Sequence, residues 1–166
     1  EQLHSPYIVR FHGLRRERGY LYMELELLQG HDLRLDVIHN QAKALDPLRV
    51  SHWLYQAALG LADAHQMKVV HRDLKPANLM IDASGRPVIM DFGLAIRSTA
   101  SDDLRLTLTG VALGTPAYMP PEQANGDVAL LDRRCDVFGL ANVRYHLKGG
   151  IDHRERNVRF GHSSGC

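Results

Sequence analysis

Apolar and β-forming residues along the chain group into short runs of the length that strands have. Tyr7–Leu14 and Tyr20–Leu28 are two such runs, and the charged segment Arg15-Arg16-Glu17-Arg18-Gly19 separates them. Strand-like runs joined by a turn predict a hairpin. A second hairpin is predicted for Leu79–Ile81 and Pro87–Met90, because Asp-Ala-Ser-Gly between them is a turn-forming sequence.

Two other segments show the period of an α-helix. Asp46-Pro47 supplies an acidic cap and a proline for the first turn, and apolar residues then recur at helical spacing as far as Met67. These are Val50, Leu54, Ala57, Leu61 and Ala64, with Trp53 added to the buried face. The second predicted helix, Arg133–Leu147, is expected to bury Asp136, Phe138, Leu140 and Val143. Val69-Val70 is predicted to be a short strand.

Composition places the chain among ordinary globular proteins. It has 166 residues, of which 45% are hydrophobic and 23% charged, enough for one domain. A net charge of +1 argues against nucleic-acid binding by bulk electrostatics. Two cysteines form no disulfide framework or metal cluster, and no apolar run approaches the ~20 residues of a membrane span. With no signal-peptide pattern at the N-terminus, the expected location is the cytoplasm.

Two loops carry the candidate chemistry. His71-Arg72-Asp73-Leu74-Lys75-Pro76-Ala77-Asn78 supplies a carboxylate, an ammonium and an amide, and Asp91-Phe92-Gly93 supplies a second carboxylate. Phosphoryl transfer from a nucleotide requires this set: a base for the acceptor hydroxyl, a cation for the phosphate, and oxygen ligands for magnesium.

These loops resemble the protein kinase family, whose signatures include H-R-D-L-x-x-x-N and D-F-G. Gly114-Thr115-Pro116 and Pro120-Pro121-Glu122 extend the resemblance, the latter with Pro120 where the family signature A-P-E has alanine. Lys75 is similar to the lysine of the Ser/Thr-specific branch, and the run from Gly114 resembles bacterial kinases of the eukaryotic type. The resemblance covers about Leu3 to Leu147.

The resemblance implies an α+β, protein-kinase-like fold that is only partly present. Residues 1–24 would be the end of the small lobe, 25–32 the hinge between lobes, and 33–147 the first half of the mainly helical large lobe. Residues 148–166, which show little periodicity, would be an irregular tail.

The resemblance also implies an ATP site. The hinge backbone at Glu26 and Leu28 would bind adenine, and Met80 would lie under the ring. Leu25 would sit behind the adenine site, although a register with Met23 in that place is also open.

Roles in catalysis follow from the same resemblance. Asp73 would be the base, Lys75 would contact the transferring phosphate, and Asn78 and Asp91 would hold Mg²⁺. The resemblance also implies supporting residues. His71 would pack beneath Phe92, Thr115 would hydrogen-bond to Asp73 and Lys75, and Asp136 would hydrogen-bond to the backbone of the catalytic loop. Gly93 and Glu122, which pairs with an arginine in the family, complete this set.

Arg72 beside Asp73 suggests control by phosphorylation, because an arginine can dock a phosphate through two hydrogen bonds. Thr109 and Thr107 stand where bacterial kinases of this type place their activation-loop threonines, and either is a candidate phosphosite. The substrate would be a protein with Ser or Thr hydroxyls.

Two family features are not found in the sequence: a G-x-G-x-x-G loop and a V-A-I-K-like strand lysine. We therefore expect negligible activity from this chain alone and a missing small-lobe segment as its partner. A kinase-derived binding module without catalysis is the alternative. A small-molecule kinase of the antibiotic-modifying type is disfavoured, because such enzymes lack a segment like Gly114–Glu122.

Overall fold

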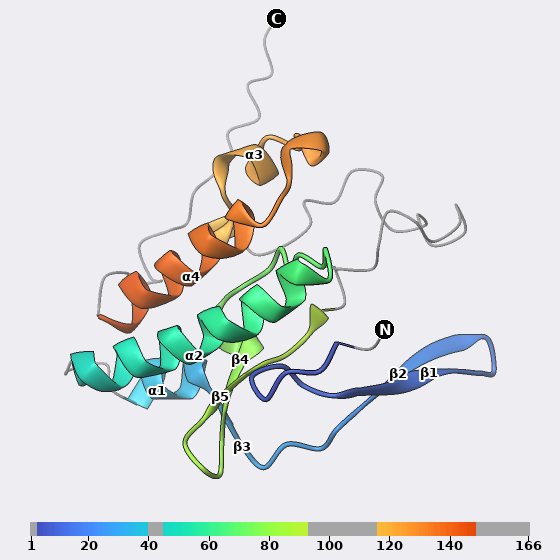
Figure 1. Ribbon diagram of the computed structural model, residues 1–166, viewed down its shortest axis with the longest axis horizontal. Helices are drawn as coiled ribbons and strands as arrows, with labels where there is room; N and C mark the ends of the chain where they lie inside the picture. Colours follow the sequence, from blue (N-terminus) through green and yellow to red (C-terminus); the bar gives the residue numbers. More distant parts are fainter. Residues whose placement is uncertain (1–2, 40–44, 93–115, 149–166) are drawn as a thin grey trace, which may run out of the picture.

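A two-stranded hairpin and a three-stranded sheet with packed helices form the structure, a computed structural model that describes residues 3–39, 45–92 and 116–148. Figure 1 shows the hairpin projecting away from the helices. The strands are β1 (Phe11–Glu17), β2 (Tyr20–Leu25), β3 (Gly30–Asp32), β4 (Leu79–Asp82) and β5 (Pro87–Ile89). The α-helices are α1 (Leu33–His39), α2 (Pro47–Gln66), α3 (Pro121–Ala124) and α4 (Arg134–Leu147), and 3₁₀ turns cover Pro76–Asn78, Pro116–Tyr118 and Val128–Leu130.

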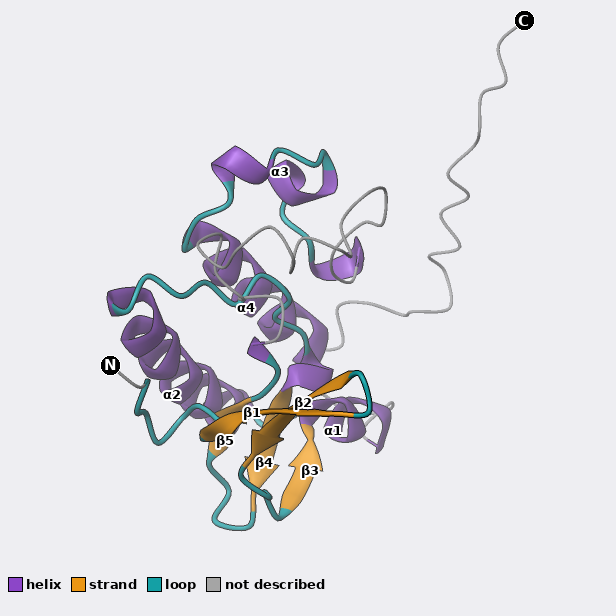
Figure 2. Cartoon of the chain, turned by 90° about the vertical axis from the view of Figure 1, so that its right-hand side faces the viewer, coloured by secondary structure: helices purple, strands orange, loops and turns teal. Residues whose placement is uncertain are grey.

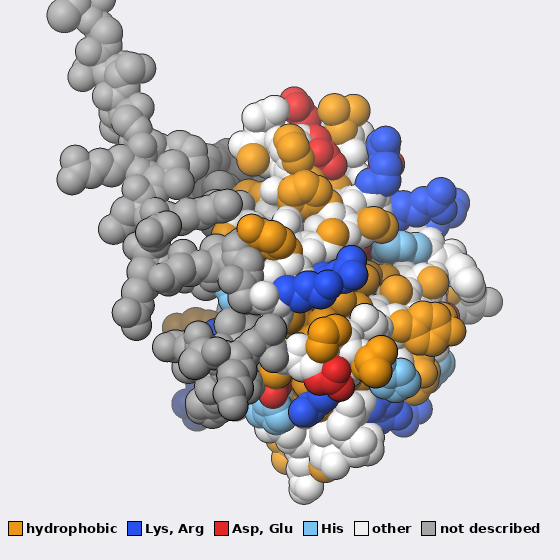
Figure 3. Space-filling model, turned by 90° about the vertical axis from the view of Figure 1, so that its left-hand side faces the viewer, with side chains coloured by type: hydrophobic (Ala, Val, Ile, Leu, Met, Phe, Trp, Pro, Cys, Tyr) orange, Lys and Arg blue, Asp and Glu red, His pale blue; other side chains and the backbone are white. Residues whose placement is uncertain are grey.

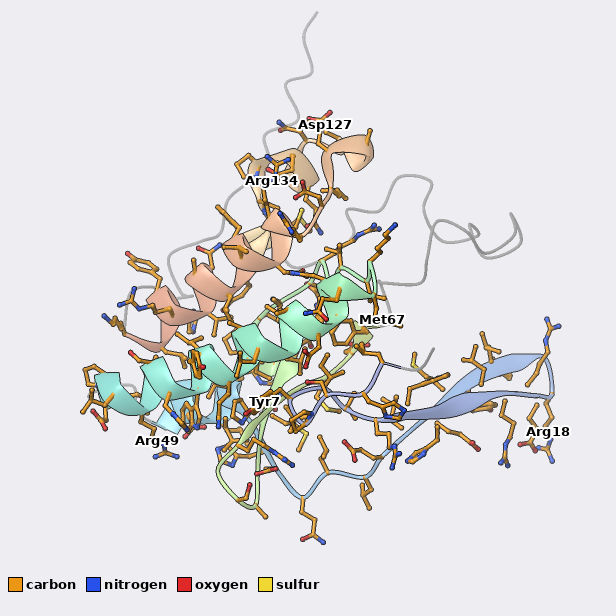
Figure 4. All side chains as sticks on the ribbon, in the orientation of Figure 1. Tyr7, Arg18, Arg49, Met67, Asp127 and Arg134 are labelled. Atoms are coloured by element: carbon orange, nitrogen blue, oxygen red, sulfur yellow. The ribbon has the colours of Figure 1, made fainter. Side chains whose placement is uncertain are left out.

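The β1–β2 hairpin turns later than the sequence predicts. Its strands run antiparallel up to the pair Glu17 and Tyr20, so the turn is Arg18-Gly19 rather than residues 15–19. Both turn residues have positive φ, 49° and 84°, as a two-residue hairpin turn requires. Figure 4 labels Arg18 at the tip. The segment before Phe11 leaves the hairpin because it pairs elsewhere.

That earlier segment joins the second sheet. Ile8 forms a parallel bridge with Ile89, where Val9 N–H donates to the Ile89 carbonyl at 2.9 Å and Ile89 N–H donates to the Tyr7 carbonyl at 2.8 Å. The β4–β5 hairpin forms as predicted, and the sheet order is β3-β4-β5 with antiparallel pairs (Figure 2).

β3 has no strand signal in its sequence, Gly-His-Asp, and was expected only to be part of the hinge. It is a strand because Gly30 lies against the backbone of β4. A Cβ at Gly30, whose φ is 156°, would stand 2.0 Å from the Ile81 carbonyl oxygen. Only glycine permits this close approach of the two strands.

Helix α2 begins as predicted. The Asp46 side chain accepts a hydrogen bond from Leu48 N–H at 3.1 Å, and Pro47 occupies the first turn. Its buried face includes Trp53, whose Nε1–H donates to the Gly85 carbonyl of the β4–β5 turn at 2.9 Å. The expected strand at Val69-Val70 is not formed, because Val69 N–H donates back to Ala64 at the helix end.

Helix α4 lies beside α2 (Figure 1). Asp136 and Val143 are fully buried, as predicted, and Leu140 is partly buried. The expected burial of Phe138 is wrong, since its exposed fraction is 39%. Asp136 and Val143 are seven residues apart and share one helix face, whereas Phe138 is rotated about 200° from Asp136.

The core lies between α2, α4 and the β3-β4-β5 sheet. It contains Leu33, Val50, Leu61, Leu79, Ile89 and Val143 among other buried apolar residues. Outside it, Figure 3 shows basic, acidic and apolar side chains interspersed over one face. Within the part of the chain that the structure describes, no helix has the length and apolar character needed to cross a bilayer.

A matched pair of leucines tests this core. Leu79 is 1% exposed in β4, and Leu48 is 80% exposed at the start of α2. Leu79→Ala should lower the free energy of unfolding by about 2–5 kcal/mol, because it leaves a cavity. Leu48→Ala should change it by less than about 0.5 kcal/mol. Urea denaturation followed by circular dichroism measures both, and equal effects would contradict the assigned core.

Candidate active site

The loop between α2 and β4 is held by a buried carboxylate from α4. Asp136, which is 0% exposed, accepts from the backbone N–H of His71 at 2.9 Å and of Arg72 at 2.8 Å. Its Oδ2 also lies 2.7 Å from His65 Nε2 at the end of α2. A buried carboxylate is stable only when donors satisfy it, so these bonds fix the loop between the two helices.

His71 lies under the loop as a neutral imidazole. Its Nε2 donates to the Met90 carbonyl at 2.8 Å, and its Nδ1 accepts from the Asp73 N–H at 3.2 Å. Burial lowers the pKa of His71 below its ordinary value of 6.5. Its ring meets Phe92 edge to face with 4.7 Å between centroids, so the two rings pack against each other at the loop.

Three polar side chains converge on the loop. Lys75 Nζ donates to Asp73 Oδ2 at 2.6 Å, and Asn78 Nδ2 donates to the same oxygen at 3.3 Å and to the Asp73 carbonyl at 2.8 Å. The Asp73 side chain is 10% exposed and that of Lys75 is 25% exposed. The carboxylate, the ammonium and the amide are therefore neighbours, and the two charged groups are open to solvent on one side.

Asn78 connects this group to a pocket of about 560 Å³. Asn78 and Asp91 line it together with apolar side chains of Leu25, Met80 and Met90. Further lining comes from Gly30, His31, Asp32, Leu35 and Ala77. The pocket thus combines apolar walls with oxygen-bearing side chains, which suits a ligand with a flat apolar part and a charged part.

The donor set fits Mg²⁺. Asn78 uses its Nδ2 to hold Asp73, which leaves its amide oxygen as a ligand, and Asp91 offers a carboxylate at the same pocket. Hard oxygen ligands of this kind are what Mg²⁺ binds, usually through one or two side chains together with phosphates of the substrate.

Two non-glycine residues in the site have left-handed backbone. Arg72 has φ 68° and Asp91 has φ 60°. Such conformations cost about 1–3 kcal/mol each and persist at functional sites when the surroundings hold them. Here Asp136 holds Arg72, and the pairing of Met90 N–H with the Asn78 carbonyl at 2.8 Å fixes the chain just before Asp91.

The α3 segment packs against the same loop. Gln123 Nε2 donates to the Arg72 carbonyl at 2.9 Å, and the Cys135 thiol lies 3.8 Å from Glu122 Oε1. Burial raises the pKa of that thiol. Sequence reasoning missed both Gln123 and His65. The only signal was their place, Gln123 directly after the Pro-Pro-Glu triplet and His65 near the end of the predicted helix.

Some predicted site residues are placed elsewhere or not described. Leu25 and Met80 line the pocket, but Glu26 and Leu28 are not among its lining residues. The Glu26 side chain accepts from Arg10 N–H at 3.0 Å instead, and the predicted contacts at these two positions involve backbone. Gly93, Thr107, Thr109 and Thr115 lie outside the described residues.

Comparison with known proteins places this site in a family. The chain belongs to the protein kinase family, because the protein kinase domain matches residues 1–153. This confirms the expected α+β, partial protein-kinase-like fold and the predicted kinase resemblance.

Three curated relatives from bacteria illustrate the similarity. The chain is 38% identical over 129 residues to the serine/threonine-protein kinase PknB of Mycobacterium tuberculosis, covering 78% of this chain and 20% of PknB. It is 37% identical over 142 residues to PknD of the same species, covering 86% and 20%. It is 36% identical over 140 residues to pkn3 of Myxococcus xanthus, covering 81% and 25%. The chain thus spans about a fifth to a quarter of these relatives' length.

The neutral state of His71 predicts how stability depends on pH. Because the pKa of His71 is lower in the folded than in the unfolded chain, the unfolded chain binds the proton first as pH falls. This contribution to stability is complete above about pH 6.5 and is lost as pH falls below it, by at most about 1.4 kcal/mol per pH unit.

Urea unfolding at about pH 7.5 and about pH 5.5 checks the sign. The free energy of unfolding should fall more between these values in the wild type than in His71→Asn, which removes the titrating ring. His52→Asn makes the same change at an exposed site of α2 and should behave like the wild type. An identical pH response of His71→Asn and wild type would show that His71 does not resist protonation.

Proposed function

We propose that this chain carries the base and metal residues of an ATP-dependent serine/threonine protein kinase. One observation supports this most strongly. The Asp73 carboxylate is joined to Lys75 and Asn78, and Asn78 shares its pocket with Asp91. A base, a phosphate-binding cation and two magnesium ligands therefore lie within one continuous site.

In this proposal the chain's own residues orient the substrate hydroxyl and accept its proton. Asp73 orients the substrate hydroxyl and accepts its proton, and Lys75 offsets the charge that develops on the transferring phosphoryl group. Asn78 and Asp91 would hold Mg²⁺, which would offset the negative charge of the nucleotide phosphates when bound. The family's loose transition state leaves positioning and charge stabilisation as the main tasks of the protein.

The nucleotide would lie with adenine between the apolar walls. Leu25 and Met80 line that part of the pocket, and the hinge backbone at Glu26 and Leu28 would supply the polar contacts. Glu26 N–H donates to the Arg10 carbonyl at 2.9 Å. The Glu26 carbonyl would therefore be the group that contacts adenine.

We infer that the substrate is a protein with Ser or Thr hydroxyls. The segment from Pro116 to Glu122, which resembles the peptide-docking part of protein kinases, contacts the catalytic loop through the neighbouring Gln123. Phosphoryl transfer by this chain alone should be negligible, because the Gly-rich loop and strand lysine of the family are not among its residues. A small-lobe segment would have to supply them.

The environment of the Arg72 side chain supports the proposal that Thr107 or Thr109 is phosphorylated. The Arg72 Nε is buried and has no hydrogen-bond partner among the described residues. An unsatisfied guanidinium N–H beside the base loop is suited to a phosphate, which would complete its hydrogen bonds.

Site-specific phosphothreonine tests this role. A phosphate at Thr109 or Thr107 should shift the Nε–H resonance of Arg72 and slow its exchange with solvent, through a new charge-assisted hydrogen bond. Phosphoserine at Ser101 is the control and should leave that resonance in place. No change with phosphate at either threonine would exclude both positions as partners of Arg72.

Nucleotide binding tests the metal assignment without requiring catalysis. A fluorescent ATP analogue should bind the wild-type chain in Mg²⁺ and lose affinity in EDTA. Asp91→Asn should weaken the Mg²⁺-dependent binding by roughly tenfold or more, because even indirect support of a metal site commonly contributes that much. Asp127→Asn, the same change at an exposed residue next to α3, should bind like the wild type.

Each outcome bears on one part of the proposal. Equal binding by Asp91→Asn and wild type would remove the metal role of Asp91. Wild-type binding that is insensitive to EDTA, or absent, would contradict the kinase site itself. Metal-dependent binding without phosphoryl transfer after a small lobe is supplied would favour the non-catalytic binding module.

A further inference from the structure

The peptide bond between Arg72 and Asp73 is held at both ends by side chains. Its carbonyl accepts from Gln123 Nε2 at 2.9 Å, and its N–H donates to His71 Nδ1 at 3.2 Å. The preceding peptide is held as well, since Arg72 N–H donates to Asp136 at 2.8 Å. Among these anchors, Gln123 is the one that comes from the α3 segment.

We propose that Gln123 is a positioning residue for Asp73. It fixes the plane of the Arg72–Asp73 peptide and thereby the direction in which the Asp73 side chain leaves the backbone. Gln123 is not among the residues that line the nucleotide pocket, and its described contact with the site is with that peptide. The catalytic meaning of this role rests on the proposed function, whereas the conformational effect does not.

Backbone strain explains why this peptide needs an anchor. Arg72 has φ 68°, a conformation that costs a non-glycine residue free energy and reverts unless neighbouring groups oppose it. Asp136 and His71 hold N–H groups of the loop, but neither bonds the Arg72 carbonyl. Without Gln123 that carbonyl is free to rotate, and the peptide plane and Asp73 would rotate with it.

Gln123 is itself held in place by its short helix. Its backbone N–H donates to the Pro120 carbonyl at 3.0 Å, and the preceding residue, Glu122, meets Cys135 of α4. A displacement of this segment, which carries the expected peptide-docking residues, would therefore move the amide that holds the Arg72 carbonyl. Through this bond the docking segment and the base are coupled.

The test measures the carbonyl directly in the isotope-labelled full chain. Gln123→Glu keeps the length and shape of the side chain but removes the N–H donor. We expect the ¹³C′ resonance of Arg72 and the ¹⁵N resonance of Asp73 to shift, and the Asp73 amide to exchange about five- to tenfold faster, as the loss of one hydrogen bond implies. Gln66→Glu, the same change at an exposed position ending α2, is the control.

Three results would overturn the proposal. The first is an Arg72 carbonyl resonance in Gln123→Glu that matches the wild type, because the bond would then be absent in solution. The second is an equally large shift in the Gln66→Glu control. The third is a change spread evenly over α2 and β4, which would make Gln123 a general stability residue. Should Gln123→Glu not fold, Gln123→Met removes the donor without adding charge and gives the same comparison.

Nucleotide binding separates this proposal from the proposed function. Gln123→Glu should keep Mg²⁺-dependent binding of the ATP analogue even where its affinity changes, whereas Asp91→Asn should lose most of that dependence. Loss of Mg²⁺-dependent binding in Gln123→Glu, with unchanged Arg72 and Asp73 resonances, would contradict the positioning role. Absence of binding in the wild type would contradict the kinase site and leave the resonance comparison to decide on Gln123.

Discussion

The arrangement of the site depends on one buried carboxylate. Asp136 is inaccessible to solvent, and its oxygens meet the His71 and Arg72 N–H groups and the His65 ring. An ionised group in such a place is costly unless several donors satisfy it, and removing the donors would cost several kcal/mol. The hydrogen bonds of Asp136 therefore hold α2, α4 and the loop that begins at His71 in one relative position. The loop that carries Asp73, Lys75 and Asn78 begins at this junction.

A series of hydrogen bonds connects this junction to the rest of the site. Asp136 supports the left-handed Arg72, His71 connects the loop to Met90, and Met90 pairs with Asn78. Asp91 follows directly, also in a left-handed conformation. Two strained residues, at about 1–3 kcal/mol each, are a sizeable fraction of the roughly 5–15 kcal/mol by which a domain is stable. Their presence in adjoining loops indicates a site where the placement of side chains is maintained at a cost in folding stability.

Local signals in the sequence predicted local structure well. The cap at Asp46, the period of α2 and the turn of the β4–β5 hairpin depend on neighbours in the chain, and all three are confirmed. What could not be predicted depends on distant partners. β3 is a strand only because β4 lies beside it, and Val69 is not one because it closes the end of α2.

The same distinction applies to the site. The two loop motifs identified Asp73, Asn78 and Asp91, and the structure brings them to one place, although their catalytic roles stay predictions. His65 and Gln123 belong to no motif, and they reach partners 71 and 51 residues away in the chain. Local patterns in a sequence do not indicate contacts at that range.

The pocket is lined by residues from two parts of the structure. One wall, Leu25, ends β2, whereas Met80 and Asn78 belong to the body formed by the helices and the second sheet. On one side of the hairpin, backbone bonds of Tyr7 and Val9 to Ile89 connect the chain to the body, and on the other side Ala83 N–H bonds to the Gln29 carbonyl just before β3. The outer part of the hairpin is solvent-exposed, with Leu14 at 59% and Leu21 at 54%. The position of Leu25 relative to Met80 therefore depends on a few peptide groups. The loop that carries Asp73 and Asn78, in contrast, is held by the buried Asp136 carboxylate and lies on a packed core.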